Sequence, residues 1–224
     1  MLTAAQTVTA AEVAFIAGST DQEINRLFDD KALPAPLWKQ ENGRRFAPLT
    51  APFATFYYRT MDDLTRSARV RVIETITERL SRRPDFDDFL ALSDPKRITD
   101  FDWSVHHASL TILLTSFVDS ALQRAAQIRR AERHIVEAAD ILGGAPCFAG
   151  TRVPIAAVLH AAQDGVSLSQ LKADYPFLTE WLIEAAKVYA RAHPKPGRPR
   201  RLREAVPNLD LVRSKVVRRP RERE

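Results

Sequence analysis

Glycines, prolines and helix-capping residues between Leu142 and Tyr189 constrain the fold of this chain more than any other feature. The run G-G-A-P and Gly150 require tight turns, and Pro154 suits the first position of a helix. That helix carries apolar residues at helical spacing and ends at Gly165. These turn-forming glycines and prolines therefore predict a short helix between two turns.

Caps mark the next two helices. Ser167-Leu168-Ser169-Gln170 has the form of a capping box, and Asp174-Tyr175-Pro176 ends the helix that this box opens. Thr179 can cap a third helix, whose apolar positions 182, 183, 186, 189 and 190 share one face. Residues 135–193 are therefore predicted to form three short helices around one small core.

The last part of the chain differs from the rest in charge. Residues 194–224 hold 11 of the 33 Lys and Arg residues but only 4 of the 28 Asp and Glu residues. This tail therefore carries +7, whereas the residues before it carry −2. Prolines interrupt the tail repeatedly, which predicts an extended basic segment that is disordered when alone. Its charge is available to an acidic partner.

Cysteine content and hydrophobicity limit the cellular locations that are expected for this chain. Cys147 is the one cysteine, which excludes an intrachain disulfide or thiolate metal site and favours a reducing, cytoplasmic location. The chain begins without a basic and apolar leader, and no stretch approaches the roughly 20 apolar residues that span a bilayer. We therefore expect neither export nor membrane association.

Two helices and a hairpin are predicted at the N-terminus. Thr9 can cap a helix that stops at Gly18, and Ser19 or Thr20 can cap a second helix with apolar positions 24, 27 and 28 on one face. Asn42-Gly43 then separates two short runs, which is a strong signal for a β-hairpin. A helix-turn-helix followed by a basic hairpin is the result.

This order resembles the DNA-binding head of MerR-like winged regulators. The resemblance covers residues 1–60 and departs where Leu27-Phe28-Asp29-Asp30 replaces the aromatic-rich segment that usually follows the second helix. It implies a winged helix-turn-helix-like DNA-binding domain at residues 1–60.

Residues 61–134 give mixed signals. Helical spacing recurs at Leu64, Ala68, Val72, Ile76 and Leu80, whereas a strand-like alternation occurs at Ala108, Leu110, Ile112 and Leu114. A further helix is predicted from Thr115 or Ser116 to Arg130, followed by a short extended piece at 134–136. We interpret this mixed α/β centre as a scaffold or dimerisation region.

The segment Ile135–His193 closely resembles the homeodomain-like domain of VapB-type antitoxins. The resemblance rests on G-G-A-P-C-F-A-G-T-R-V-P, then G-V-S, then D-Y-P-F-L-T. It implies a protein that inactivates a PIN-like, metal-dependent ribonuclease from the same operon and often represses that operon. Cys147 and Ala149 stand where the family often has aliphatic and basic residues.

DNA contact is predicted for polar residues of the second helix and the hairpin, which are types that read base edges or meet phosphates. These residues are Thr20, Gln22, Asn25, Arg26, Lys39, Arg44 and Arg45. The alternative is a scaffold with solvated polar residues, because acids at positions 21, 23, 29 and 30 would repel phosphate. Glu180 and Glu184 disfavour DNA reading by the third C-terminal helix, which we expect to pack, dimerise or present the tail.

Toxin contact is predicted for the tail, where apolar residues interleave with cations that can pair with an active-site carboxylate cluster. These residues are Leu202, Val206, Leu209, Leu211, Arg213, Lys215, Arg218 and Arg219. The alternative is a solubilising polyelectrolyte segment.

The sequence contains no Walker loop, G-x-S-x-G, H-E-x-x-H or G-x-G-x-x-G, and we expect no catalysis, cofactor or metal. The predicted fold class is mainly α with a small β component and a basic tail at 194–224. The predicted function is a homodimeric antitoxin that neutralises a PIN-like ribonuclease toxin and binds operator DNA. The alternative is a stand-alone winged-helix transcriptional regulator.

Overall fold

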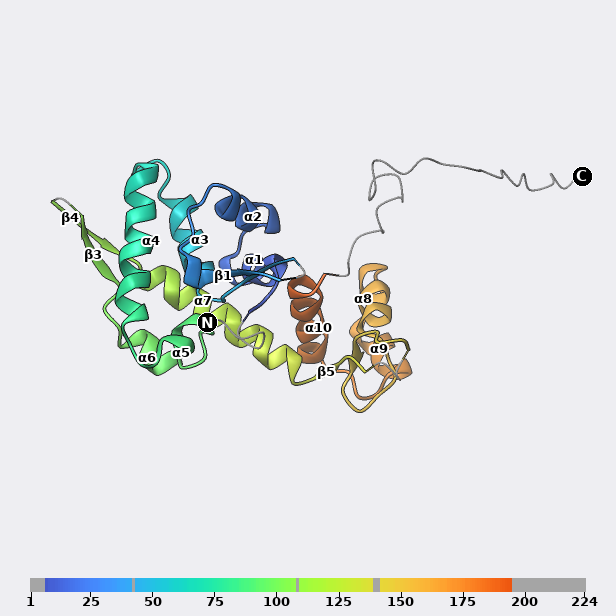
Figure 1. The fold of residues 1–224 in the computed structure, drawn as a ribbon. Helices are drawn as coiled ribbons and strands as arrows, with labels where there is room; N and C mark the ends of the chain where they lie inside the picture. The colour runs from blue at the N-terminus through green and yellow to red at the C-terminus, as the bar shows by residue number, and fades with distance from the viewer. Residues whose placement is uncertain (1–6, 42, 108, 139–141, 195–224) are drawn as a thin grey trace, which may run out of the picture. The chain divides into compact units, whose positions relative to one another are not determined.

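The computed structural model describes residues 7–41, 43–107, 109–138 and 142–194, and these residues are mainly helical with small antiparallel sheets (Figure 1). The described residues up to Pro194 belong to one compact unit. The helices are α1 (Ala10–Ala17), α2 (Asp21–Asp29), the 3₁₀ turn η2 (Ala35–Leu37), α3 (Thr50–Arg59), α4 (Arg66–Ser81), α5 (Phe86–Leu90), α6 (Pro95–Thr99), α7 (Thr115–Glu132), α8 (Ile155–Gln163), α9 (Leu168–Asp174) and α10 (Glu180–Ala192). The strand pairs are β1 (Trp38–Gln40) with β2 (Arg44–Phe46), β3 (Ser104–His107) with β4 (Leu110–Leu113), and β5 (Ile135–Val136) with β6 (Cys147–Phe148).

The caps predicted for the first two helices are confirmed. The Thr9 hydroxyl accepts the Glu12 N–H at 3.2 Å, and α1 ends at Gly18, whose φ of +67° is left-handed. Thr20 and Glu23 form a reciprocal capping box that starts α2. Local side-chain chemistry therefore sets both ends of the turn between α1 and α2.

The predicted hairpin is also confirmed. Strands β1 and β2 pair antiparallel with Lys39 opposite Arg45, and Gly43 takes a φ of +122° in the connection. The backbone of Val8 adds a short bridge to Phe46, with hydrogen bonds of 2.8 and 3.0 Å. The segment before α1 is thereby attached to the outer side of the hairpin.

Helix α3 was not predicted from the sequence. Buried residues surround almost its whole circumference, from Thr50 to Tyr57, so no polar stripe marks a helical period. Its N-cap, Leu49, makes no side-chain cap hydrogen bond. Such a helix is recognisable only once its neighbours are known.

The centre differs in part from the prediction. Helix α4 confirms the helical spacing, but the expected strand is one arm of a hairpin, because Ser104–His107 pairs with Leu110–Leu113. Half-buried Ile112, exposed Leu113 and buried Leu114 follow the expected alternation, whereas Leu110 departs from it because it is 59% exposed. Helix α7 begins at Thr115 without a side-chain cap from Thr115 or Ser116.

The three helices predicted for residues 135–193 are confirmed, and we call this segment the C-terminal module. Ser167 and Gln170 form the capping box of α9, and the Thr179 hydroxyl accepts the Leu182 N–H of α10 at 3.1 Å. Strands β5 and β6, of which β6 was not predicted, pair beside the helices. The helices surround a small core whose buried residues are Ala131, Ile135, Phe148, Ile155, Val158, Leu171, Leu178, Ile183, Ala185, Ala186 and Tyr189.

Helices α7 and α10 join this small core to a larger N-terminal core. Along α7, residues from Val118 to Ile128 lie in the larger core and Ala131 lies in the smaller one. Along α10, Ala192 belongs to the larger core, and Val188 packs against both. The C-terminal module and the N-terminal helices are therefore packed on a shared pair of helices.

A partly buried charged cluster lies where the end of α10 meets α1 and α7. His193 Nε2 is 3.4 Å from Glu132 Oε1, and His193 Nδ1 is 3.9 Å from Glu12 Oε2. Burial raises the pKa of Glu12 to about 7, against the opposing effect of nearby His193. The nearby Glu132 carboxylate raises the pKa of His193. Folding therefore favours the protonated forms of Glu12 and His193.

We expect this cluster to make stability fall as pH rises from the unfolded Glu pKa towards neutrality. Both folded pKa values lie above their unfolded values, so the folded state binds more protons, and each such proton contributes a slope of up to about 1.4 kcal/mol per pH unit. Glu12→Gln should flatten the fall in urea-unfolding free energy between about pH 5 and about pH 7. Glu74→Gln, at an exposed glutamate, should leave this fall in unfolding free energy unchanged. Equal pH slopes for the unmodified protein and the two variants would contradict the assignment of the fall to Glu12.

Candidate nucleic-acid interface

The exposed face of α2 carries two of the side chains predicted to read DNA. Gln22 is exposed, and the Arg26 side chain is 76% exposed. Thr20 is also exposed, but its hydroxyl is engaged with Glu23 in the cap of the helix. Among the residues predicted to contact DNA, Gln22 and Arg26 are therefore the exposed side chains on α2 that a base edge can approach.

Arg44 joins the hairpin to α2. Its guanidinium donates to both carboxylate oxygens of Asp29, at 2.6 and 3.2 Å, and to Asn25 Oδ1 at 3.3 Å. The same guanidinium lies 4.5 Å from the centroid of the Phe28 ring. Planar, bidentate pairing with a stacked ring fixes orientation as well as distance. Arg44 is thus a positioning residue at the junction of α2 and the hairpin.

The other predicted cations also have intramolecular partners. Arg26 Nε is 3.8 Å from Asp30 Oδ2, and Lys39 Nζ is 2.5 Å from Glu41 Oε1. Arg45 Nη2 donates to the carbonyl of Thr7 at 2.9 Å. The ion pairs of Asp29 and Asp30 offset the negative charge of this face, which weakens the repulsion that these acids would exert on phosphate.

Two further residues hold α2 in place and were missed from the sequence. Arg66, at the start of α4, donates to the carbonyl of Asp30 at the C-terminal end of α2. The Tyr58 hydroxyl of α3 donates to the Glu23 carbonyl at 2.9 Å, and burial raises the pKa of this tyrosine to about 12. Neither residue lies in a recognisable motif, so only the packing of α3 and α4 against α2 shows their role.

The third helix of the C-terminal module presents a mixed surface. Glu180 is exposed at its first turn, and the exposed Glu184 pairs with Lys187 at 2.6 Å. Trp181 is 38% exposed and lies edge-on to His134, with ring centroids 4.5 Å apart. Acidic and aromatic groups at the start of α10 are typical of a packing surface and contrast with the amide and guanidinium of α2.

The predicted toxin-binding residues lie outside the described part of the chain. They are Leu202, Val206, Leu209, Leu211, Arg213, Lys215, Arg218 and Arg219.

The described residues contain no group of three or more His, Cys, Asp or Glu residues arranged to hold a metal ion. No helix within the described ranges is long and apolar enough to cross a bilayer.

These observations define a mainly helical protein with two cores, in which a helix pair and hairpin precede a three-helix module. Residues 135–190, which cover nearly all of the C-terminal module, match the family described as "Protein of unknown function (DUF433)". No solved structure matches the chain.

A relative extends the similarity to the N-terminal part. The "Uncharacterized protein y4eO" of Sinorhizobium fredii (strain NBRC 101917 / NGR234) is 31% identical over 196 residues, which cover 88% of this chain and 86% of that protein. The chain therefore belongs to the family of this rhizobial protein. The alignment is too long to be confined to the C-terminal module, so the N-terminal helices and the centre are shared at least in part.

We expect Arg44→Ala to lower the free energy of unfolding by about 1 kcal/mol, because it removes a bidentate ion pair and a stacked ring contact at a partly exposed site. Urea unfolding of Arg44→Ala, Asp29→Asn and the double variant should reveal a positive coupling between the two residues. Arg26→Ala serves as the comparison and should cost less, since its ion pair is longer and more exposed. If the losses of unfolding free energy in the two single variants simply add up in the double variant, the predicted coupling between Arg44 and Asp29 is contradicted.

Proposed function

We propose that this protein is a DNA-binding antitoxin that represses its own operon and neutralises a PIN-like ribonuclease. The observation that carries the DNA-binding part is the arrangement of α2, which presents exposed Gln22 and Arg26 beside a hairpin held by Arg44. Helix, turn, helix and basic hairpin occur in the order typical of MerR-like winged regulators. In this proposal α2 is the recognition helix and the hairpin is the wing.

The chemistry of α2 favours this assignment over the C-terminal module. An amide such as that of Gln22 pairs with adenine, and a guanidinium such as that of Arg26 pairs with guanine in the major groove. Arg26 lies 3.8 Å from Asp30, a weak and exposed pair that a base or phosphate can displace. The cations of the hairpin add a salt-dependent attraction to the DNA backbone.

Arg26→Glu is expected to weaken binding to the operon's promoter by at least about tenfold, because it removes a base-reading group and adds a repulsive charge. Fluorescence anisotropy with a labelled promoter fragment at several salt concentrations measures this change. Gln22→Ala should reduce discrimination between promoter and unrelated DNA, with a smaller effect on nonspecific binding.

Lys187→Glu provides a charge-matched control on α10. Its lysine already pairs with Glu184, and we expect promoter affinity to change by less than about threefold. Loss of promoter binding in Lys187→Glu together with retention in Arg26→Glu would assign DNA reading to the C-terminal module and would overturn the proposed role of α2.

The antitoxin part of the proposal rests on the similarity of the C-terminal module to VapB-type antitoxins and on the charge of the tail. The tail combines +7 with interleaved apolar residues, which suits a segment that orders on an acidic partner. An inserted guanidinium can pair bidentately with the carboxylates of a PIN-like active site and compete with the metal there.

Truncation after His193 is expected to abolish neutralisation of the ribonuclease encoded beside this chain. An RNA-cleavage assay with the purified nuclease measures residual activity, and circular dichroism of the truncated chain checks that its helices are retained. Full inhibition by the truncated chain would show that the tail is not the inhibitory segment.

A stand-alone transcriptional regulator is the second candidate. A cavity that reaches the turn between α1 and α2 favours this candidate, because such a turn is where a bound ligand could influence DNA binding. Co-expression with the neighbouring gene product distinguishes the two, since an antitoxin co-purifies with its nuclease and a stand-alone regulator does not.

A further inference from the structure

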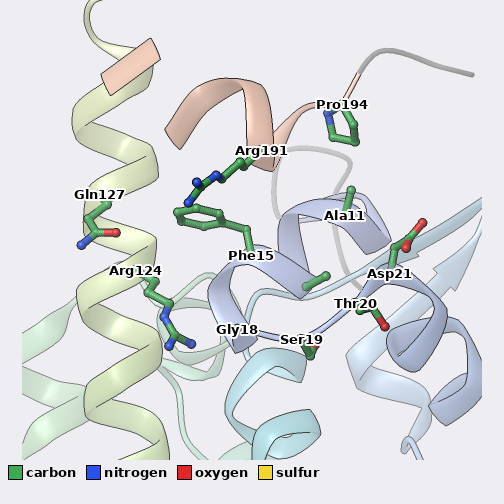
Figure 2. Close-up of a pocket in the computed structure, with 11 residues that line it drawn as sticks. Ala11, Phe15, Gly18, Ser19, Thr20, Asp21, Arg124, Gln127, Arg191 and Pro194 are labelled. Atoms are coloured by element: carbon green, nitrogen blue, oxygen red, sulfur yellow. The ribbon is translucent and has the colours of Figure 1, made fainter. Parts of the chain in front are cut away.

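A cavity of about 640 Å³ beside the start of α2 is bounded by three parts of the fold. Its walls come from α1 and the α1–α2 turn, from α7, and from the end of α10 (Figure 2). This volume lies in the range of sites that hold small organic molecules. The cavity is thus large enough for a ligand that touches all three walls.

Basic and amide side chains come from the α7 and α10 walls. Figure 2 shows Arg124 and Gln127 projecting from α7 and Arg191 projecting from α10. Arg124 Nη1 donates to the Ile16 carbonyl at 3.3 Å, a single long bond that leaves most of its donors available. Arg191 and Gln127 are exposed. These walls are therefore rich in donors for an anion.

Gly18 allows the Arg124 guanidinium to lie against the α1–α2 turn. A Cβ atom built on Gly18 would be 2.3 Å from Arg124 Nη1, so any other residue would displace the guanidinium. Gly18 therefore suits the left-handed end of α1 and leaves room for this position of Arg124.

The α1–α2 wall supplies an apolar surface and further polar groups. Ala11, Ala14 and Phe15 form its apolar part. Ser19 also lines the cavity, and its buried hydroxyl has no hydrogen-bond partner among the described residues. Asp21 also lines the cavity, but its carboxylate accepts the N–H of Gln22 at 3.0 Å, at the positive end of α2.

We infer that this cavity binds a small organic anion, with its carboxylate or phosphate monoester head on Arg124 and Arg191 and its apolar body against Phe15. The two guanidinium groups outweigh the Asp21 carboxylate, so this lining is net positive and attracts a carboxylate or a phosphate monoester. The apolar wall favours a head group attached to a hydrocarbon or aromatic body over a bare inorganic ion.

The position of the site predicts a consequence for regulation, which rests on the proposed DNA-binding role of α2. Thr20 and Asp21, at the first turn of α2, are part of the cavity lining. A bound anion adds negative charge beside the helix end that would approach DNA phosphates, and like charges repel. The anion therefore acts as an inducer that lowers affinity for the promoter.

Calorimetric titration of the full chain tests the site without DNA. The probes are phenyl phosphate, benzoate and inorganic phosphate at concentrations up to about 10 mM, so that binding as weak as millimolar is detected. We expect phenyl phosphate or benzoate to bind at least about tenfold more tightly than inorganic phosphate. Binding of one aromatic probe but not the other identifies the head group and supports the site.

Two cavity variants and one matched control locate the binding. Arg191→Met and Arg124→Met should each weaken binding of the aromatic probe by at least about fivefold, whereas Arg130→Met, an exposed arginine of α7 outside this cavity, should not. Because Arg191 is exposed, Arg191→Met is expected to leave the fold intact, so a loss of probe binding in this variant reports on the cavity. Absence of aromatic-probe binding, or equal effects of Arg130→Met and Arg191→Met, would overturn the site.

Promoter binding measured with and without the probe separates this inference from the proposed function. A several-fold loss of promoter affinity that disappears in Arg191→Met supports the inducer role. Probe binding with unchanged promoter affinity retains the site and rejects the regulatory role. Failure of the protein to bind its promoter at all rejects the proposed DNA-binding function and leaves the calorimetric result standing.

Discussion

The packing of α7 and α10 against each other is the contact on which the rest of the structure depends. Small residues such as Ala131 and Ala192 are almost completely buried there, which lets two cores share the same helices. Helix α10 supplies part of the hydrophobic core of the C-terminal module, and it also packs against the N-terminal helices. A three-helix unit is thus stabilised by more apolar burial than a segment of its length could supply alone.

Electrostatics at α2 links packing to the proposed function. Asp29 is one of the acidic residues that argue against DNA binding when the sequence is considered alone, and it is the partner that positions the hairpin through Arg44. The same ion pairs reduce the negative charge of the face and leave Gln22 and Arg26 at its surface. Acid in a recognition helix is therefore compatible with phosphate when its charge is paired within the fold.

The shared helices also bring distant charged groups to one place. Glu12 from α1, Glu132 from α7 and His193 after α10 meet at one end of this contact, and Arg124 and Arg191 from α7 and α10 line the cavity beside the α1–α2 turn. Both clusters connect the C-terminal module to the first helices. A ligand or proton bound at either cluster would act on the contact between the two cores, because each cluster includes residues from both α7 and α10.

The sequence by itself determined the local elements. Thr20, Ser167 and Thr179 cap their helices, and Gly18 and Gly43 adopt left-handed backbone angles, because each effect involves residues within a few positions of one another. Tertiary structure alone decided the existence of α3, because burial on nearly all of its sides hides the helical period in the sequence. It also decided the partners of Arg44, Arg124 and His193. These partners lie 15 and 108 positions away for Arg44 and Arg124, and a side chain's charge does not specify which distant opposite charge or carbonyl the folded chain will place beside it.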